Sequence, residues 1–167
     1  MEIRAERETD IDAVRAVNIS VFETPCEANL VDALRKQATP VVSLIAKEGD
    51  TIVGHIMFSP VSLSGLPELK IIGLAPMAVM PERQRKGIGS ALVRAGLEQC
   101  KQLGFVAVVV LGHTEYYPRF GFSPTSRFGI DCEYDVPEEA FMAMELQPDA
   151  LHEKTGKVKY HAAFSSL

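Results

Sequence analysis

The chain of 167 residues lacks the features that mark several protein classes. Its three cysteines, Cys26, Cys100 and Cys132, are widely spaced and form no C-x-x-C pair, so the sequence suggests neither a disulfide framework nor a zinc site. It has no apolar run of about 18 residues, and its first ten residues are charged where a secretory signal needs an apolar core. We therefore expect a cytoplasmic protein that spans no membrane and holds no metal.

Positive charge is also in short supply. The chain has 17 Lys and Arg residues against 22 Asp and Glu residues, and its net charge is −5. This balance argues against general binding to nucleic acid or to an anionic membrane, because both need a basic surface. The basic residues that do cluster lie within one short segment, Arg83 to Lys86. We expect a small anionic ligand there, and neither nucleic acid nor membrane as a partner.

The remaining composition is typical of a globular core, with 47% hydrophobic and 23% charged residues, and predicts one domain over residues 1–167. A strand is expected over residues 2–6, then a helix capped by Thr9 or Asp10. A second helix is expected with Thr24 as its cap, Pro25 in its first position and Glu27 as a capping-box acid. Strands over 41–47 and 51–63 form a hairpin, and two late strands are expected over 141–146 and 157–164.

The central stretch runs from Ile71 to Gly104. An apolar strand leads through Pro81 and the basic segment into Gly87 and Gly89, which open a helix; a second apolar strand, 105–111, follows. The two glycines let a ligand approach the backbone, and the N–H groups at the start of the helix lack carbonyl partners. An anionic oxygen binds to such a helix start. Together with the basic residues, this predicts a diphosphate site, although a tight turn with solvated basic residues remains the alternative.

Two other phosphate-binding designs do not fit. The P-loop pattern G-x-x-x-x-G-K-[ST] is absent. A dinucleotide fingerprint needs a third small residue where Leu92 stands and an acid at the end of the next strand, which ends at Leu111 without one.

Gln84 to Gly89 form a Q-x-x-G-x-G segment that closely resembles the acyl-CoA-binding motif of the GNAT family of N-acetyltransferases. Tyr117 to Phe122, Y-P-R-F-G-F, resemble the Y-x-x-x-G-F segment of the same family. The resemblance implies the GNAT acyl-CoA N-acyltransferase fold, an α/β domain with a mixed central sheet of about six or seven strands flanked by helices. It also implies acetyl-CoA as co-substrate and no metal.

The resemblance also implies a set of site residues. The pantetheine arm of acetyl-CoA would lie along the strand end, and the pyrophosphate on the loop and helix start. The expected cofactor-binding residues are Met77, Ala78, Val79, Arg85, Lys86, Gly87, Ile88, Gly89 and Ser90.

Tyr117 takes the place of the family's general acid, which protonates the departing thiolate; its alternative is a buried structural tyrosine. Tyr116 is the neighbour most easily confused with it. His113 is the expected general base because an imidazole titrates near neutral pH, although a loop histidine bonded to a carbonyl would look the same in sequence. Glu27, Glu115 and His55 are weaker candidates.

These residues predict an N-acetyltransferase that moves the acetyl group of acetyl-CoA to a primary amine of a small molecule or peptide, by direct attack in a ternary complex. The alternative is a GNAT-like domain that binds acyl-CoA without turnover or acts as a regulatory partner. The sequence is compatible with a homodimer.

Overall fold

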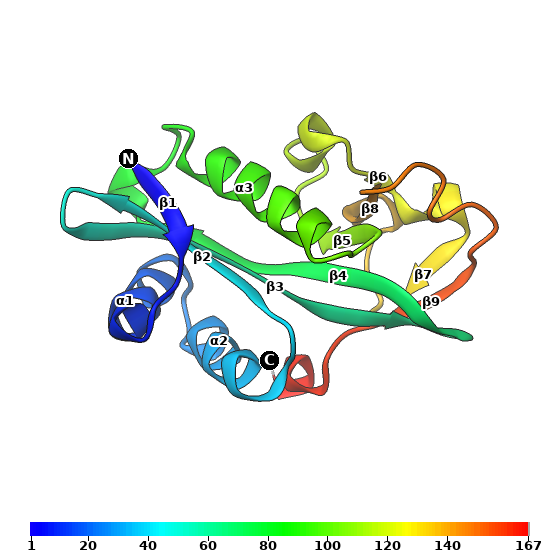
Figure 1. Cartoon of the computed structure of the whole chain (residues 1–167), viewed down its shortest axis with the longest axis horizontal. Coiled ribbons are helices and arrows are strands. Elements are labelled where there is room, and N and C mark those ends of the chain that lie inside the picture. The colour runs from blue at the N-terminus through cyan, green and yellow to red at the C-terminus, as the bar shows by residue number, and fades with distance from the viewer. Residues whose placement is uncertain (167) are drawn as a thin grey trace.

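The computed structural model of the chain describes residues 1–166, which form a mixed sheet with helices on both faces (Figure 1). The α-helices are α1 (Ile11–Val21), α2 (Cys26–Gln37) and α3 (Ile88–Gln102). The strands are β1 (Glu2–Ala5), β2 (Val42–Glu48), β3 (Thr51–Leu63), β4 (Leu66–Val79), β5 (Ala107–Leu111), β6 (Ser123–Pro124), β7 (Ile130–Cys132), β8 (Phe141–Glu145) and β9 (Gly156–Lys159). No helix within these residues is long and apolar enough to cross a bilayer.

The strand order is β1-β2-β3-β4-β5-β8-β6, and β9 pairs with both β3 and β7. The pairs β4–β5 and β7–β9 are parallel, and the others are antiparallel. The predicted α/β class and mixed sheet are confirmed. The described residues form nine strands rather than six or seven, because β6 and β7, of two and three residues, are too short to show an alternating pattern.

Several predicted boundaries differ from the structure. The strand expected over 105–111 begins at Ala107, and the strand expected over 2–6 ends at Ala5. The late strand expected over 157–164 ends at Lys159, and Ala162–Ser166 form a short 3-10 helix. Helix α2 begins at Cys26, one residue later than expected, with Pro25 as its cap residue. Thr24 still contributes, but its Oγ1 accepts from the nearby Cys26 N–H at 3.3 Å, and Glu27 forms no capping box.

The sheet separates two hydrophobic layers. Helix α3 covers one face, and α1 and α2, together with the 3-10 helix near the C-terminus, cover the other (Figure 1). The alternation of β4 shows this division: Leu74, Met77 and Val79 pack in the α3 layer, whereas Ala75 and Ala78 pack in the α1–α2 layer. Side chains from the end of β4 therefore reach both layers, and the predicted site lies at this strand end.

The start of α1 is held by a buried carboxylate. Asp10 accepts from the Arg7 N–H at 2.7 Å and from both terminal nitrogens of Arg4 at 2.6 and 3.1 Å. The bond from Arg4, more than the bond from Arg7, lowers the pKa of Asp10 to about 2. Asp10 occupies the N-cap position of α1, but its side chain bonds backward to Arg4 and Arg7 and makes no capping hydrogen bond to the helix.

Candidate functional site

Strands β4 and β5 part where the site is expected. Their last paired residues are Leu74 and Val110, while β4 continues along β3 to Val79. The β3–β4 register shifts by one residue between Leu74 and Met77, which marks a β-bulge. Among the described residues, the β4 edge from Met77 to Val79 that faces away from β3 has no strand partner. The backbone groups of this edge that are not bonded within the chain are available to an extended ligand. The three predicted strand residues, Met77, Ala78 and Val79, lie on this edge.

The basic loop is tied to the end of this strand. Gln84 Nε2 donates to the carbonyl of Val79 at 2.9 Å, so the side chain that opens the Q-x-x-G-x-G segment fixes the loop against β4. Arg83 is partly committed elsewhere, since its Nε lies 3.2 Å from Glu48. The ion pairs of the described residues include neither Arg85 nor Lys86, and both are exposed. These two cations therefore remain available to an anion.

The two glycines of the motif do different work. Gly87 is the residue that caps α3 and has φ +86°, a conformation that favours glycine, while a Cβ there would meet nothing within 4 Å. Gly89 lies two residues further on, where a Cβ would come within 3.4 Å of the Tyr116 hydroxyl and 3.7 Å of Met77 Cε. Gly87 thus sets the direction of the loop, and Gly89 leaves space beside the helix start.

The first turn of α3 offers free donors at this space. The first helical bond runs from the Ala91 N–H to the Gly87 carbonyl, and no side chain caps the helix. The N–H groups of Ile88, Gly89 and Ser90 therefore have no partner inside the helix. Their dipoles and the two exposed cations favour an anionic group at this point.

Tyr116 is a candidate site residue to which the sequence analysis gave no role. Its hydroxyl lies 3.1 Å from Ser90 Oγ, and its ring carries the Arg119 guanidinium at 4.5 Å from the centroid. The segment after β5 is thereby joined to the first turn of α3. No local signal distinguishes Tyr116 from Tyr117, because the contact depends on how two segments 26 residues apart pack together.

Tyr117 is buried behind Tyr116, with 7% of its surface exposed. Its ring packs edge-on against Tyr116 at 5.1 Å and against Phe122 at 5.7 Å between centroids. Burial, and to a smaller extent Tyr116, raises the pKa of Tyr117 to about 12. The phenol therefore stays protonated at neutral pH, as a proton donor must.

The histidines differ in their surroundings. His113 is exposed in the loop after β5, and its carbonyl accepts from the N–H groups of Tyr116 and Tyr117. His55 is fully buried; its Nε2 lies 2.9 Å from Ser43 Oγ and its Nδ1 lies 3.2 Å from Asn18 Nδ2. Burial, with the charge of Arg35, lowers the pKa of His55 to about 3, so this imidazole stays neutral.

The tautomer of His55 follows from its neighbours. Asn18 Nδ2 also donates to the Val14 carbonyl at 3.1 Å, which identifies that atom as the amide nitrogen. The amide therefore donates to Nδ1, and the proton of the imidazole lies on Nε2, facing Ser43. His55 is held as a structural core residue, which explains its buried position without a catalytic role.

The other base candidates lie outside this cluster. Glu27 is in the first turn of α2 and Glu115 is exposed in the loop after β5. Within residues 1–166 no group of three His, Cys, Asp or Glu side chains is arranged to hold a metal ion. The donors at the site are backbone N–H groups, hydroxyls and cations, a set suited to an organic anion.

Comparisons with known proteins show which family the chain resembles. The model of the acetyltransferase (GNAT) family matches residues 11–122, which include all the candidate site residues. The uncharacterized N-acetyltransferase YhbS of Escherichia coli strain K12 is 35% identical over 166 residues, 99% of each chain. The crystal structure of YhbS from Escherichia coli in complex with CoA has a TM-score of 0.93, covering 98% of this chain and 91% of that chain. A GNAT family acetyltransferase from Brucella melitensis, in complex with acetyl-CoA, is 37% identical with a TM-score of 0.81, covering 98% and 97%.

Proposed function

The chain belongs to the acetyltransferase (GNAT) family, and from this premise we propose that it transfers the acetyl group of acetyl-CoA to a primary amine by direct attack in a ternary complex. As a GNAT N-acetyltransferase it uses acetyl-CoA as its acyl donor. The observation that carries the proposal is the meeting of three segments around Gly89: the free end of β4, the start of α3 and the tyrosines after β5.

Different residues bind different parts of acetyl-CoA. The pantetheine arm bonds to the backbone of Met77, Ala78 and Val79 along the free edge of β4. The pyrophosphate takes the N–H groups of Ile88, Gly89 and Ser90, with Arg85 and Lys86 beside it. Gly87 sets the loop conformation that aims these donors. The thioester then lies in the gap where β4 and β5 part.

The reaction needs one bond formed and one broken. The amine lone pair attacks the thioester carbon, the carbon–sulfur bond breaks, and CoA leaves as a thiolate that takes a proton. We propose Tyr117 as the donor of that proton and His113 as the base that accepts the proton lost by the amine. Because His113 is exposed, it can exchange that proton with solvent.

The high pKa of Tyr117 is compatible with this role. In water a thiol has a pKa of about 8.5, and proton transfer from a phenol of pKa about 12 would be uphill. Burial raises the pKa of a thiol in the same way, as in this chain, where it raises the pKa of Cys100 to about 12. A CoA sulfur enclosed between the strand ends therefore stays matched to Tyr117.

The reaction is proposed to take place in the cytoplasm, where the free thiols Cys26, Cys100 and Cys132 stay reduced. One observation favours the alternative, a domain that binds acyl-CoA without turnover: no hydrogen bond in residues 1–166 joins the His113 imidazole to another candidate residue.

Release of free thiol from acetyl-CoA, measured with a panel of primary amines, decides between the two. The proposal predicts release that depends on the amine and yields one acetylated amine for each CoA. Tight binding of acetyl-CoA with no amine-dependent release would favour the binding domain.

A further inference from the structure

A cavity of about 430 Å³ lies at the point where β4 and β5 separate. Its walls come from the strand ends and from the last third of the chain. The lining residues include Leu74, Ala75, Leu111, Tyr134, Tyr160 and Phe164. Its volume is within the range of small-molecule sites, about 300–1,000 Å³. A single ring with a short side chain is of the right size for it.

The cavity opens toward the layer opposite the one that holds the cofactor residues. Met77, Val79 and Tyr116 pack on the α3 side of the sheet, whereas Ala75, Tyr160 and Phe164 pack on the α1–α2 side. Pairing between β4 and β5 ends at Leu74, so the sheet is interrupted between the two sides. A thioester that enters the gap from the α3 side therefore meets this cavity, and an acceptor held there can reach the thioester carbon.

Apart from Ser165 and the tyrosine hydroxyls, the described residues that line the cavity are apolar, and none of them carries a charged side chain. Among the described residues only five large hydrophobic side chains are exposed, and two of them line it, Leu111 at 40% and Tyr134 at 38%. Exposed apolar groups gathered around a cavity mark a place where a ligand covers them. An ammonium group would lose hydration here, and the described lining residues offer no carboxylate to replace it, which favours a neutral amine on an apolar body.

Three aromatic rings form one side of the cavity. Tyr160 packs edge-on against Tyr134 at 5.8 Å and against Phe164 at 5.0 Å between centroids. Tyr160 is 8% exposed, and its hydroxyl has no hydrogen-bond partner in the described part of the chain. The rings thus offer a ligand an aromatic contact.

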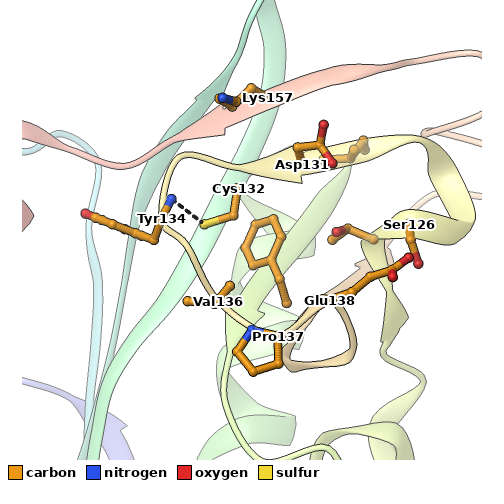
Figure 2. A pocket seen from close by; sticks show the side chains of 11 residues that line it. Ser126, Asp131, Cys132, Tyr134, Val136, Pro137, Glu138 and Lys157 are labelled. Carbon is orange, nitrogen blue, oxygen red and sulfur yellow. Dashed lines mark hydrogen bonds between the residues drawn. The ribbon is translucent and has the colours of Figure 1, made fainter.

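A second cavity of about 380 Å³ adjoins this one and has the acidic side chains that a polycation would need (Figure 2). The two share Tyr134 and Val136, but the second is lined by the charged side chains of Asp131, Glu138 and Lys157. In Figure 2 the Tyr134 ring points away from Asp131 and Glu138. These two carboxylates line the neighbouring cavity. The carboxylate of Glu133 accepts from the Tyr160 N–H at 2.9 Å and does not line the cavity at the strand ends.

We propose that the acceptor is a primary amine on an aromatic carbon skeleton whose amino group is its only ionisable group, bound against Tyr134, Tyr160 and Phe164. This assignment rests on the proposed acetyl transfer. The nitrogen attacks the thioester as its neutral form, so the desolvation of the cavity itself assists the loss of the amine proton. Polyamines and lysine-containing peptides, which bring further charges, are poor substrates.

The test compares kcat/KM for CoA release with 2-phenylethylamine and with spermidine at saturating acetyl-CoA. We expect 2-phenylethylamine to be favoured by at least about tenfold, the size of a lost apolar contact. Leu111→Asp should lower its kcat/KM by about tenfold. The matched control is Leu103→Asp at the end of α3, where the leucine is 38% exposed and outside both cavities. A preference for spermidine, or equal effects of the two substitutions, would overturn the assignment.

Calorimetric titration of the wild-type complex with CoA separates this proposal from the proposed function. If 2-phenylethylamine binds and Phe164→Ala weakens it by about tenfold, the cavity is assigned whatever the turnover. If it binds but no amine is acetylated, the transfer is wrong and the cavity remains a binding site. If it does not bind while another amine is acetylated, the assignment of the acceptor class is wrong and the transfer stands.

Discussion

The hydroxyl of Tyr116 lies 3.1 Å from Ser90 Oγ and borders the space that Gly89 leaves open. This contact brings the segment after β5 to the first turn of α3, beside the free end of β4. The proposed cofactor site and the proposed proton donor lie at this junction, and the proposed acceptor cavity lies where β4 and β5 separate. The predictions below test each of these parts separately.

The first prediction concerns Gly89. Gly89→Val places a branched side chain in the space beside the helix start, so the pyrophosphate loses backbone bonds that are worth about 1.5–3 kcal/mol each when charged. We expect the Kd for acetyl-CoA to rise between about tenfold and a hundredfold, measured by calorimetry. The fold should be retained, since valine is the better helix former of the two.

The control for this prediction is Gly87→Asn. Asparagine tolerates the positive φ of Gly87, and a Cβ there meets nothing within 4 Å. Binding should therefore change little. Equal losses at the two positions would show that loop conformation rather than space at Gly89 governs binding.

The second prediction concerns the pyrophosphate. Acetyl-CoA should raise the melting temperature, whereas S-acetylpantetheine, which lacks the pyrophosphate, should not at the same concentration. A ligand at a hundred times its Kd adds about 2.7 kcal/mol, or several degrees for a chain of this size. Equal shifts with both ligands would remove the loop from the account.

The third prediction separates the two tyrosines. Tyr117→Phe keeps the buried ring but removes the proton donor, so we expect kcat to fall by about 10²–10⁴-fold with little change in acetyl-CoA affinity. Tyr116→Phe removes the hydroxyl that contacts Ser90 Oγ, so it should weaken acetyl-CoA binding without a comparable fall in kcat. If Tyr117→Phe keeps most of its kcat, solvent protonates the thiolate instead.

The fourth prediction concerns His55, which is neutral in the folded protein because its pKa lies near 3, against about 6.5 in the unfolded chain. Between these values only the unfolded state binds the proton. The free energy of unfolding should therefore be constant with respect to His55 above pH 6.5 and fall by up to about 1.4 kcal/mol per pH unit below it.

Urea denaturation between pH 4.5 and 7.5 measures this slope. The pKa of Asp10 is about 2 in the folded protein against an ordinary value of 3.8, so its contribution is lost mainly below pH 3.8, outside this range. His55→Gln, which retains a donor and an acceptor but does not titrate, should reduce the slope. Parallel profiles for the wild type and the variant would contradict the assignment.

Much of this arrangement could be predicted from sequence because it depends on local patterns. The strand before Pro81, the glycine turn and the helix after it were predicted from apolar runs and backbone requirements, and α3 does begin at Ile88. The hairpin of β2 and β3 was predicted for the same reason. The different roles of Gly87 and Gly89 could not be predicted, since they depend on contacts with Tyr116 and Met77 from other segments.

The proposed acceptor cavity could not be predicted from the sequence. Tyr134 and Tyr160 lie in a region with few periodic signals, and β7 and β9, which flank them, are three and four residues long. Their grouping with Leu111 results from strand pairings between distant segments, such as Ile130 with Gly156. The burial of Tyr117, which sets its pKa, arises in the same way from packing against Phe122 and Tyr116.

The central claim, direct transfer within a ternary complex, is tested most directly by bisubstrate kinetics with an accepted amine. Initial rates of CoA release are measured at several fixed concentrations of acetyl-CoA while the amine is varied. Direct attack requires both substrates to be bound together, so double-reciprocal lines should intersect. Parallel lines, accompanied by an acetylated enzyme when the amine is omitted, would indicate a covalent intermediate and contradict the account.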